Sequence, residues 1–151
     1  MKRFLLLGCV VGSLAVSDVA SAQAGISLGA AVGSTYRDSK LQINDDRHGL
    51  LYLRLGLPLL PYGARADLLV LDEPNADYDV AAIASVVASL NAPLVQPYVL
   101  LGYGRYGLRT TDLDGVSYGA GLRIGGKRGL FIEGRRHEAI DRDLISIGLA
   151  F

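Results

Sequence analysis

The chain has 151 residues, a formal net charge of zero at pH 7 and 50% hydrophobic residues. This length provides for one domain, and the charge balance gives no reason to expect nucleic acid or another strongly charged partner. No apolar run reaches the roughly 18–20 residues that a membrane-spanning helix needs. The 19 glycines separate short apolar segments, which favours an all-β chain over a helical one.

Residues 1–22 are predicted to be a cleaved secretory signal peptide. Lys2 and Arg3 supply a positive start, residues 4–16 are largely apolar, and the small-x-small pattern of residues 20–22 precedes the expected cleavage point. A retained anchor is the alternative, but the apolar run is too short for one. The mature domain is then expected to span residues 23–151.

Cys9 is the only cysteine, and it lies inside this leader. Residues 6–9 superficially resemble a lipoprotein box, but too few residues precede the cysteine for a normal export signal. The mature chain is therefore predicted to contain no thiol, no disulfide and no cysteine metal site, and nothing in it calls for a cofactor.

After residue 23, apolar residues alternate with small or polar ones with a period of two, which is the pattern of β-strands. The clearest case is 116–125, where Val116, Tyr118 and Ala120 alternate with serine and glycine. Eight such segments occur, each near the roughly 9–11 residues that a tilted strand needs to cross a bilayer. They cover about residues 25–36, 49–57, 62–70, 79–89, 96–104, 116–125, 130–137 and 144–151.

The connections between these segments alternate in length. Long or acidic connections follow the first, third, fifth and seventh strands, and tight turns follow the second, fourth and sixth. This asymmetry is typical of outer-membrane barrels, which have short turns in the periplasm and long loops outside. An even number of strands would leave both termini in the periplasm. The long connections are 37–48, 72–78, 108–115 and 138–142, and the turns are 58–61, 91–93 and 126–129.

The apolar face of the strands is predicted to point outward. In a soluble, lipocalin-like barrel the apolar set would point inward, and the outer face would need a cover of charge. The mature chain has only Lys40 and Lys127 as lysines, both in connections, and neither strand face could supply that cover. The sequence therefore predicts an eight-stranded, antiparallel, up-and-down transmembrane β-barrel with small residues inside.

Six ionisable side chains share the predicted inward face. Because buried charges are costly unless they are paired, the favoured interpretation is an ion-pair network that fills the lumen. The alternative is a gate or an anion-selective constriction, although eight strands leave little room for a pore. The six residues are Arg54, Arg65, Asp67, Arg123, Glu133 and Arg135.

Arg105 and Arg136 have outward parity near the loop-side ends of their strands. Arginine costs little at the membrane interface, and its guanidinium binds phosphate in a bidentate manner. These residues are therefore candidates for contact with lipopolysaccharide at the rim, and a rim charge without specific function is the equal alternative. Aromatic residues near strand ends would form an interfacial girdle: Tyr62, Tyr103, Tyr118 and Phe151.

The acidic connections and the two histidines are the parts of the sequence that could bind a metal or take part in catalysis. Asp45-Asp46 and the segment 112–115 offer fewer oxygen ligands than a calcium loop needs, so solvated acidic loops are favoured and no metal site is predicted. The only histidines, His48 and His137, lie at loop-side strand ends, while Ser146 is expected to face the lumen farther from the loops. No catalytic residues are predicted.

The mature region resembles the small outer-membrane barrels of the OmpA/OmpX-like class. The resemblance rests on the eight alternating strands and on the segments 97–104, 130–135 and 144–151. It implies that the C-terminal strand carries the signal read by the barrel-assembly machinery, although Leu149 stands where tyrosine is common. No peptidoglycan-binding domain is expected after the barrel. The signal residues would be Ile145, Ile147, Leu149 and Phe151.

These observations favour a monomeric, non-enzymatic barrel in a bacterial outer membrane, surrounded by lipid and lipopolysaccharide. Its role would be structural support of envelope integrity or surface interaction through the acidic loops. A lipid A-modifying enzyme and a narrow channel for small solutes remain the alternatives.

Overall fold

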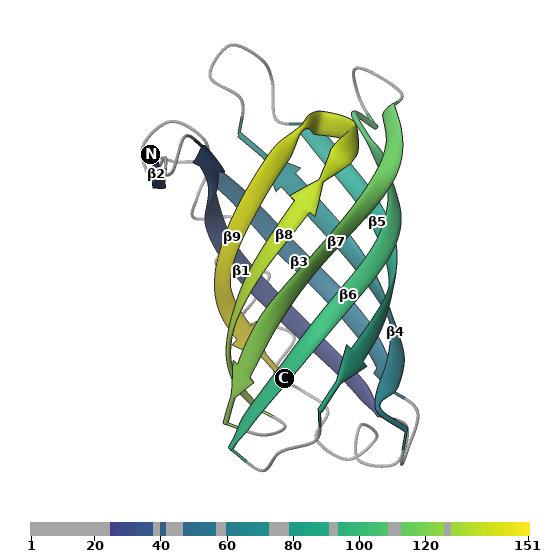
Figure 1. Cartoon of the computed structure of the whole chain (residues 1–151), viewed down its shortest axis with the longest axis vertical. Helices are drawn as coiled ribbons and strands as arrows, with labels where there is room; N and C mark the ends of the chain where they lie inside the picture. Colours follow the sequence, from purple (N-terminus) through teal and green to yellow (C-terminus); the bar gives the residue numbers. More distant parts are fainter. Residues whose placement is uncertain are drawn as a thin grey trace.

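The computed structural model shows one antiparallel sheet closed into a barrel (Figure 1). It describes residues 25–37, 40–41, 47–56, 60–72, 79–90, 94–108, 113–125 and 128–151. The strands are β1 (Ile26–Arg37), β2 (Lys40–Leu41), β3 (Arg47–Gly56), β4 (Tyr62–Leu71), β5 (Asp79–Ser89), β6 (Val95–Tyr106), β7 (Leu113–Ile124), β8 (Gly129–His137) and β9 (Arg142–Ala150). The predicted leader, residues 1–22, lies outside the described residues.

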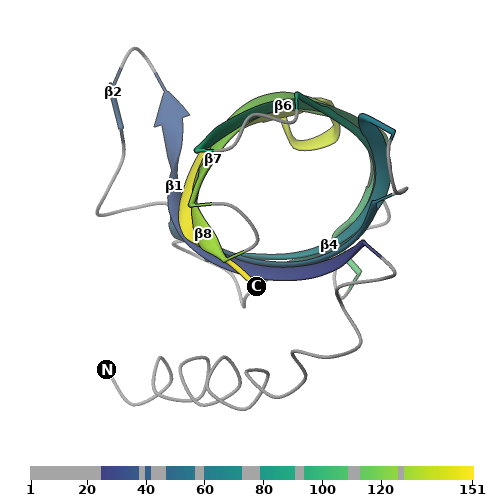
Figure 2. The same ribbon diagram turned by 90° about the horizontal axis from the view of Figure 1, so that it is seen from below.

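Eight strands form the wall of the barrel, in the order β1-β3-β4-β5-β6-β7-β8-β9, with β9 pairing back onto β1. The view along the barrel shows this closed ring (Figure 2). Closure is completed at the last residue, because Phe151 and Leu28 exchange two backbone hydrogen bonds of 2.7 and 3.0 Å. The predicted eight-stranded, antiparallel, up-and-down barrel is confirmed.

The short strand β2 was not predicted. It pairs with the last two residues of β1, with Tyr36 opposite Leu41 and Arg37 opposite Lys40. Two residues are too few to show the alternation on which the sequence prediction depends. The segment 37–48, predicted as a loop, therefore contains an extension of the sheet beyond the barrel wall.

The predicted faces of the strands are also confirmed. On β5 and β6 the outward side chains of Val86 and Leu101 are 62% and 61% exposed. Their chain neighbours Val87 and Leu100 point inward and are 1% and 3% exposed. Apolar residues therefore cover the outer wall, while the interior mixes apolar side chains with most of the buried polar ones. This is the reverse of the arrangement that keeps a barrel soluble in water.

The connections at the two ends differ less in length than predicted, because the strands continue further. Tyr106 still pairs with Leu113 at the end of the β6–β7 ladder, and the β8–β9 connection, 138–141, is as short as the turn 125–128. We call the end of the barrel with the β4–β5, β6–β7 and β8–β9 connections the loop end. The turn end is the end with residues 57–61, 90–94 and 125–128.

The β8–β9 connection folds over the loop end of the barrel. It contains the 3-10 turn η1 (Glu138–Ile140) and ends at Asp141, whose φ of 53° lies in the left-handed region. Ala139 and Ile140 pack against the buried core.

No helix in the described part of the chain is long and apolar enough to cross a membrane.

Small residues on the inner face make room for large inward side chains. Gly29 of β1 lies directly opposite Tyr52 of β3, and the Tyr52 ring covers the space that a side chain at Gly29 would need. A Cβ atom added there would lie 2.6 Å from the Tyr52 hydroxyl oxygen. Gly134, by contrast, faces outward and has nothing within 4 Å of such an atom.

We therefore expect Gly29→Val to destabilise the barrel by about 1–3 kcal/mol, because it overpacks the interior. Gly134→Val is the matched control and should leave stability unchanged. The measurement is the midpoint at which the folded, heat-modifiable band is lost on gels run after stepwise heating in detergent. Equal midpoints for the two variants would contradict this packing of Tyr52.

Candidate functional site

The inner residues of β4 and β8 meet in the middle of the lumen. These strands lie on opposite walls, because three strands separate them in either direction around the closed sheet. Their inward parity places Arg65 and Asp67 on one wall and Glu133 and Arg135 on the other. We call these four side chains the lumenal brace.

Short contacts join the brace across the lumen. The Arg65 guanidinium donates to both carboxylate oxygens of Glu133, with N–O distances of 2.5 and 3.2 Å. Its Nε atom donates to Asp67 Oδ1 at 2.5 Å. From the opposite wall, Arg135 Nη1 donates to Asp67 Oδ2 at 2.8 Å. Each arginine therefore contacts a carboxylate that is carried by the facing strand.

Neutral side chains complete the hydrogen bonding of the brace. The Tyr98 hydroxyl donates to Glu133 Oε2 at 2.7 Å. Arg135 Nη2 donates to the hydroxyls of Ser85 and Ser117 at 2.6 and 2.9 Å. These three partners add strands β5, β6 and β7 to the network, so five of the eight wall strands contribute to it.

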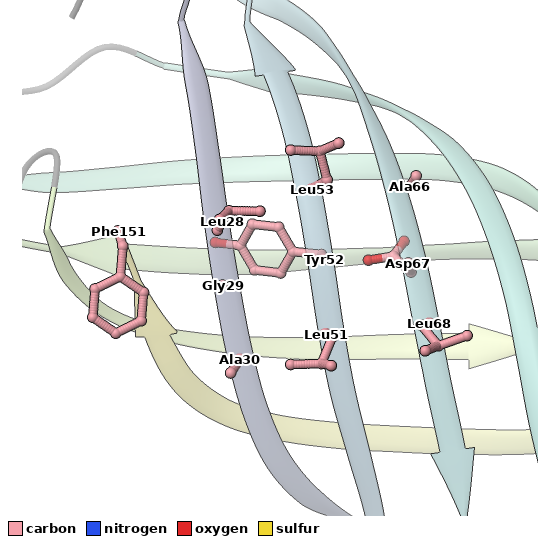
Figure 3. Close-up of a pocket in the computed structure, with 10 residues that line it drawn as sticks. All are labelled: Leu28, Gly29, Ala30, Leu51, Tyr52, Leu53, Ala66, Asp67, Leu68 and Phe151. Carbon is pink, nitrogen blue, oxygen red and sulfur yellow. The ribbon is translucent and has the colours of Figure 1, made fainter. Parts of the chain in front are cut away.

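Aromatic rings form one side of the brace. The Arg65 guanidinium carbon lies 4.1 Å from the centroid of the Tyr52 ring, a cation–π geometry. Tyr52 in turn meets Phe131 edge to face, with ring centroids 5.4 Å apart. Figure 3 shows Tyr52 beside Gly29, with Asp67 on the next strand. The rings and the ions together occupy the central lumen.

The brace is electrically neutral and almost fully buried. Its two arginines and two carboxylates have side chains that are at most 4% exposed. Removing such charges from water is costly, and close pairing with additional hydrogen bonds offsets that cost. The arrangement is thus suited to holding opposite walls at a fixed separation.

Arg54 and Arg123, the other two residues of the predicted network, lie toward the turn end. Arg54 is paired with Arg65 in the β3–β4 ladder, but its Nη2 donates to Ser89 at 2.9 Å. Arg123 is 8% exposed and is paired with Phe131 in the β7–β8 ladder. The structure therefore brings four of the six predicted residues together and places these two beside them.

The two histidines lie inside the loop end of the barrel. His48 Nε2 and Ser146 Oγ are 2.7 Å apart, and the Tyr106 hydroxyl and His137 Nδ1 are 2.8 Å apart. Ser146 is buried on the lumenal side, as predicted, and its contact with His48 was not expected from its place farther from the loops. All four residues are buried, and His48 Nδ1 has no hydrogen-bond partner in the described part of the chain that would orient the ring. The geometry does not expose a serine nucleophile to a substrate.

The two predicted rim arginines face outward. Arg136 forms ion pairs with Asp141 and, at 3.2 Å, with Asp143. Arg105 is exposed and lies opposite Asp114 in the β6–β7 ladder. Each rim arginine therefore has a carboxylate on a neighbouring segment, a feature that the sequence reasoning did not anticipate.

Two hollows in the described surface lie on the outer wall. One, of about 330 Å³, is lined mainly by outward side chains of β1, β3 and β4, together with Phe151 (Figure 3). The other, of about 730 Å³, lies near the turn end between Tyr62, Val99 and Ile132. Both are apolar depressions in the outer wall and hold no cluster of chemically reactive groups.

Metal-ligating side chains do not gather within the described ranges, where no three histidine, aspartate or glutamate residues come together. Asp45, Asp46 and Asp112 lie outside the described residues.

The predicted assembly-signal residues of β9 and the chain end all face outward and are partly exposed: Ile145, Ile147, Leu149 and Phe151.

No known protein family and no curated protein matches the sequence. The structure is similar to one described as a de novo design of transmembrane β-barrels, with a TM-score of 0.60 and 14% identity over 83% of this chain and 92% of that chain. It is also similar to the crystal structure of Ail, the attachment invasion locus protein of Yersinia pestis, with a TM-score of 0.50 and 19% identity over 83% and 93% of the two chains.

At these identities the similarity concerns the fold. The chain has the fold of small transmembrane β-barrels, and the predicted resemblance to the OmpA/OmpX-like class is confirmed at that level. The similarity covers most of both chains.

Removing one carboxylate from the brace should be costly. We expect Asp67→Asn to lower the free energy of unfolding by about 3–5 kcal/mol, because it strands two buried arginines. The matched control is Asp143→Asn, which removes a partly exposed partner of Arg136 and should cost less than about 1 kcal/mol. Urea unfolding of the lipid-reconstituted barrel provides the comparison. A similar cost for both variants would mean that the brace does not stabilise the barrel.

Proposed function

We propose that this chain is a non-enzymatic, integral outer-membrane β-barrel with a sealed lumen, which supports envelope integrity or surface interactions. The observation that carries this proposal is the lumenal brace, a neutral network of buried ions joined across the centre of the barrel. A barrel built for transport would need a continuous path where these side chains lie.

The outer wall supports placement in a membrane. Large apolar side chains on its strands are about half exposed, among them Leu55, Ile132 and Ile147. Such a surface is stable in hydrocarbon and would aggregate in water. Tyr62 and Phe151 near the turn end, and Tyr103 and Tyr118 nearer the loop end, are suited to the two interfaces. In this proposal the turn end and both chain ends are periplasmic.

The outward residues of β9 and the arginines at the rim of the barrel suggest which partners the chain contacts. We propose that the outward residues of β9 and Phe151 are read by the barrel-assembly machinery. Contact of Arg105 and Arg136 with lipopolysaccharide stays a prediction. Each of the two arginines also has a carboxylate beside it: Asp141 and Asp143 beside Arg136, and Asp114 opposite Arg105.

A channel function is disfavoured by the packing of the lumen at two levels. The brace crosses its centre, and Tyr106, Leu144 and the residues of η1 pack together at the loop end. The large inner side chains that the structure describes, among them Tyr106, Phe131 and Leu69, are almost completely buried.

We therefore expect the purified, folded barrel to produce no discrete current steps above baseline in a planar bilayer at 1 M salt. Folding and insertion are verified on the same sample by the heat-dependent shift in gel mobility. Discrete, reproducible steps from correctly folded protein would overturn the sealed-lumen proposal.

An enzymatic role is disfavoured because the His48–Ser146 pair is buried inside the barrel. We expect the mass of lipid A to be the same in cells that express the chain and in cells that lack it. The variant His48→Ala is the control for any change that does occur. A mass shift corresponding to one acyl chain that disappears in His48→Ala would contradict the non-enzymatic proposal.

A further inference from the structure

Two turns at the turn end of the barrel carry exposed apolar side chains. In the β5–β6 turn Leu90 and Leu94 are 69% and 75% exposed, more than the outward valines and leucines of the described wall strands. In the β3–β4 turn Leu60 is 52% exposed, and Pro61 beside it is also exposed. We call these four side chains the apolar turn surface.

The two apolar turns are neighbours in the structure. The ladder between β4 and β5 continues to the pair of Tyr62 and Ala88 at the turn end. One residue further out, the Ser89 backbone N–H donates to the Pro61 carbonyl at 2.7 Å. The sheet pairing therefore continues up to the turns themselves and holds them side by side.

The third turn of this end differs from the other two in charge. Residues 125–128 include Lys127 and Arg128, whereas residues 57–61 and 90–94 include no charged residue. Turns that face water are dominated by glycine and small polar residues, with proline where φ must be fixed. The composition of the third turn suits water, and the leucines of the other two suit an apolar medium.

The height of the apolar wall points to the same medium. The outward face of β6 is apolar from Val95 to Tyr103 and ends at the exposed Arg105. With a rise of about 3.3 Å per residue and a tilt of about 40°, this stretch spans about 20 Å along the membrane normal, whereas the apolar band of a transmembrane barrel is about 25 Å tall. Because a charged residue ends the stretch on the loop side, the missing height lies on the turn side, where Leu94 directly precedes the strand.

The backbone of the two apolar turns is also suited to an apolar medium. Irregular backbone is costly there unless its N–H and C=O groups have partners. The carbonyls of Pro61, Leu94 and Pro97 accept hydrogen bonds from adjoining segments. Proline has no N–H to satisfy, and four of the five prolines of the chain lie in or beside these turns: Pro58, Pro61, Pro93 and Pro97.

The hollow of about 730 Å³ continues the apolar turn surface toward the middle of the wall. Its lining includes Pro61 and Leu90 of that surface, followed by Tyr62, Val99 and Ile132 of the wall strands, and no charged side chain lines it. A site for a protein partner would have a polar rim. This surface instead runs into the lipid-facing wall without a charged border, so the partner that fits it is lipid.

We propose that the apolar turn surface is immersed among the acyl chains of the periplasmic leaflet, where a phospholipid chain fills the adjoining hollow, while the turn 125–128 stays at the water boundary. This inference rests on the proposed function, which places the wall in the membrane and the turn end in the periplasm. The immersion removes exposed leucine side chains from water, which is favourable.

The test uses tryptophan fluorescence, because the chain has no tryptophan of its own. The full mature barrel is folded into phosphatidylcholine vesicles as Leu94→Trp and as the matched control Arg128→Trp, and folding is verified by the heat-dependent shift in gel mobility. Quenching is measured with phosphatidylcholine brominated near the headgroup end of one acyl chain, and with acrylamide on both sides of the membrane. We expect the brominated lipid to remove most of the emission of Leu94→Trp, and acrylamide to remove most of the emission of Arg128→Trp.

A third variant separates this inference from the proposed function. Leu101→Trp lies in the middle of the wall and should be quenched by the brominated lipid. Quenching of Leu101→Trp without quenching of Leu94→Trp would overturn the immersion of the turns and leave the membrane barrel intact. If Leu101→Trp also escapes the brominated lipid, the proposed function itself is contradicted. Leu90→Trp takes the place of Leu94→Trp if the latter fails to fold.

Two other results would also overturn the proposal. Equal quenching of Leu94→Trp and Arg128→Trp by the brominated lipid would mean that the whole turn end, or the indole itself, enters the membrane without regard to the apolar turn surface. Protection of Leu94→Trp from both quenchers would mean that protein covers this surface, as in contact with a second copy of the chain.

Discussion

Opposite walls of this barrel are joined by ionised side chains that cannot separate without leaving a charge buried and unmatched. Arg65 reaches Glu133, and Arg135 reaches Asp67, so each wall supplies one cation and one anion to the other. Such pairs tolerate little displacement, because the desolvation cost is offset only by close contact. The separation of β4 and β8 depends on these contacts, and the small inward residues around them follow from the space that the brace needs.

The molecule therefore has two surfaces with different sources of stability. The outer wall is apolar and gains nothing from burial within the chain, since a barrel of this fold keeps it in contact with lipid. Inside, close polar contacts and ring packing replace much of what a hydrophobic core supplies in a soluble domain. The mixture of Leu69, Ile83 and Phe131 with the buried ions shows that the interior is packed and not solvated. This division explains why glycine and serine are frequent on the inner face.

Local features were predictable from the sequence, and distant contacts were not. Alternation of period two identified all eight wall strands and their outward faces, and the tight turn after β3 is a local feature that places Arg54 opposite Arg65. The contact of Arg65 with Glu133 depends on which strands face each other across the ring, and on how far the long side chains reach. β4 and β8 are the third and seventh of the eight wall strands, and such strands lie opposite each other in a closed ring. The strand order alone could therefore have indicated the contact between Arg65 and Glu133. The His48–Ser146 contact was missed because it depends on the stagger of β3, β1 and β9, which alternation does not report.

The hydrogen bonds between Phe151 and Leu28 place the last residue of the chain against its first wall strand. The ring closes through the contact with the largest separation along the sequence, so its entropic cost exceeds that of any hairpin in the wall. Until that moment a growing sheet has two free edges that could pair with another chain. The sheet therefore loses its free edges only when β9 pairs with β1. A partially synthesised chain is an open sheet and not a smaller barrel.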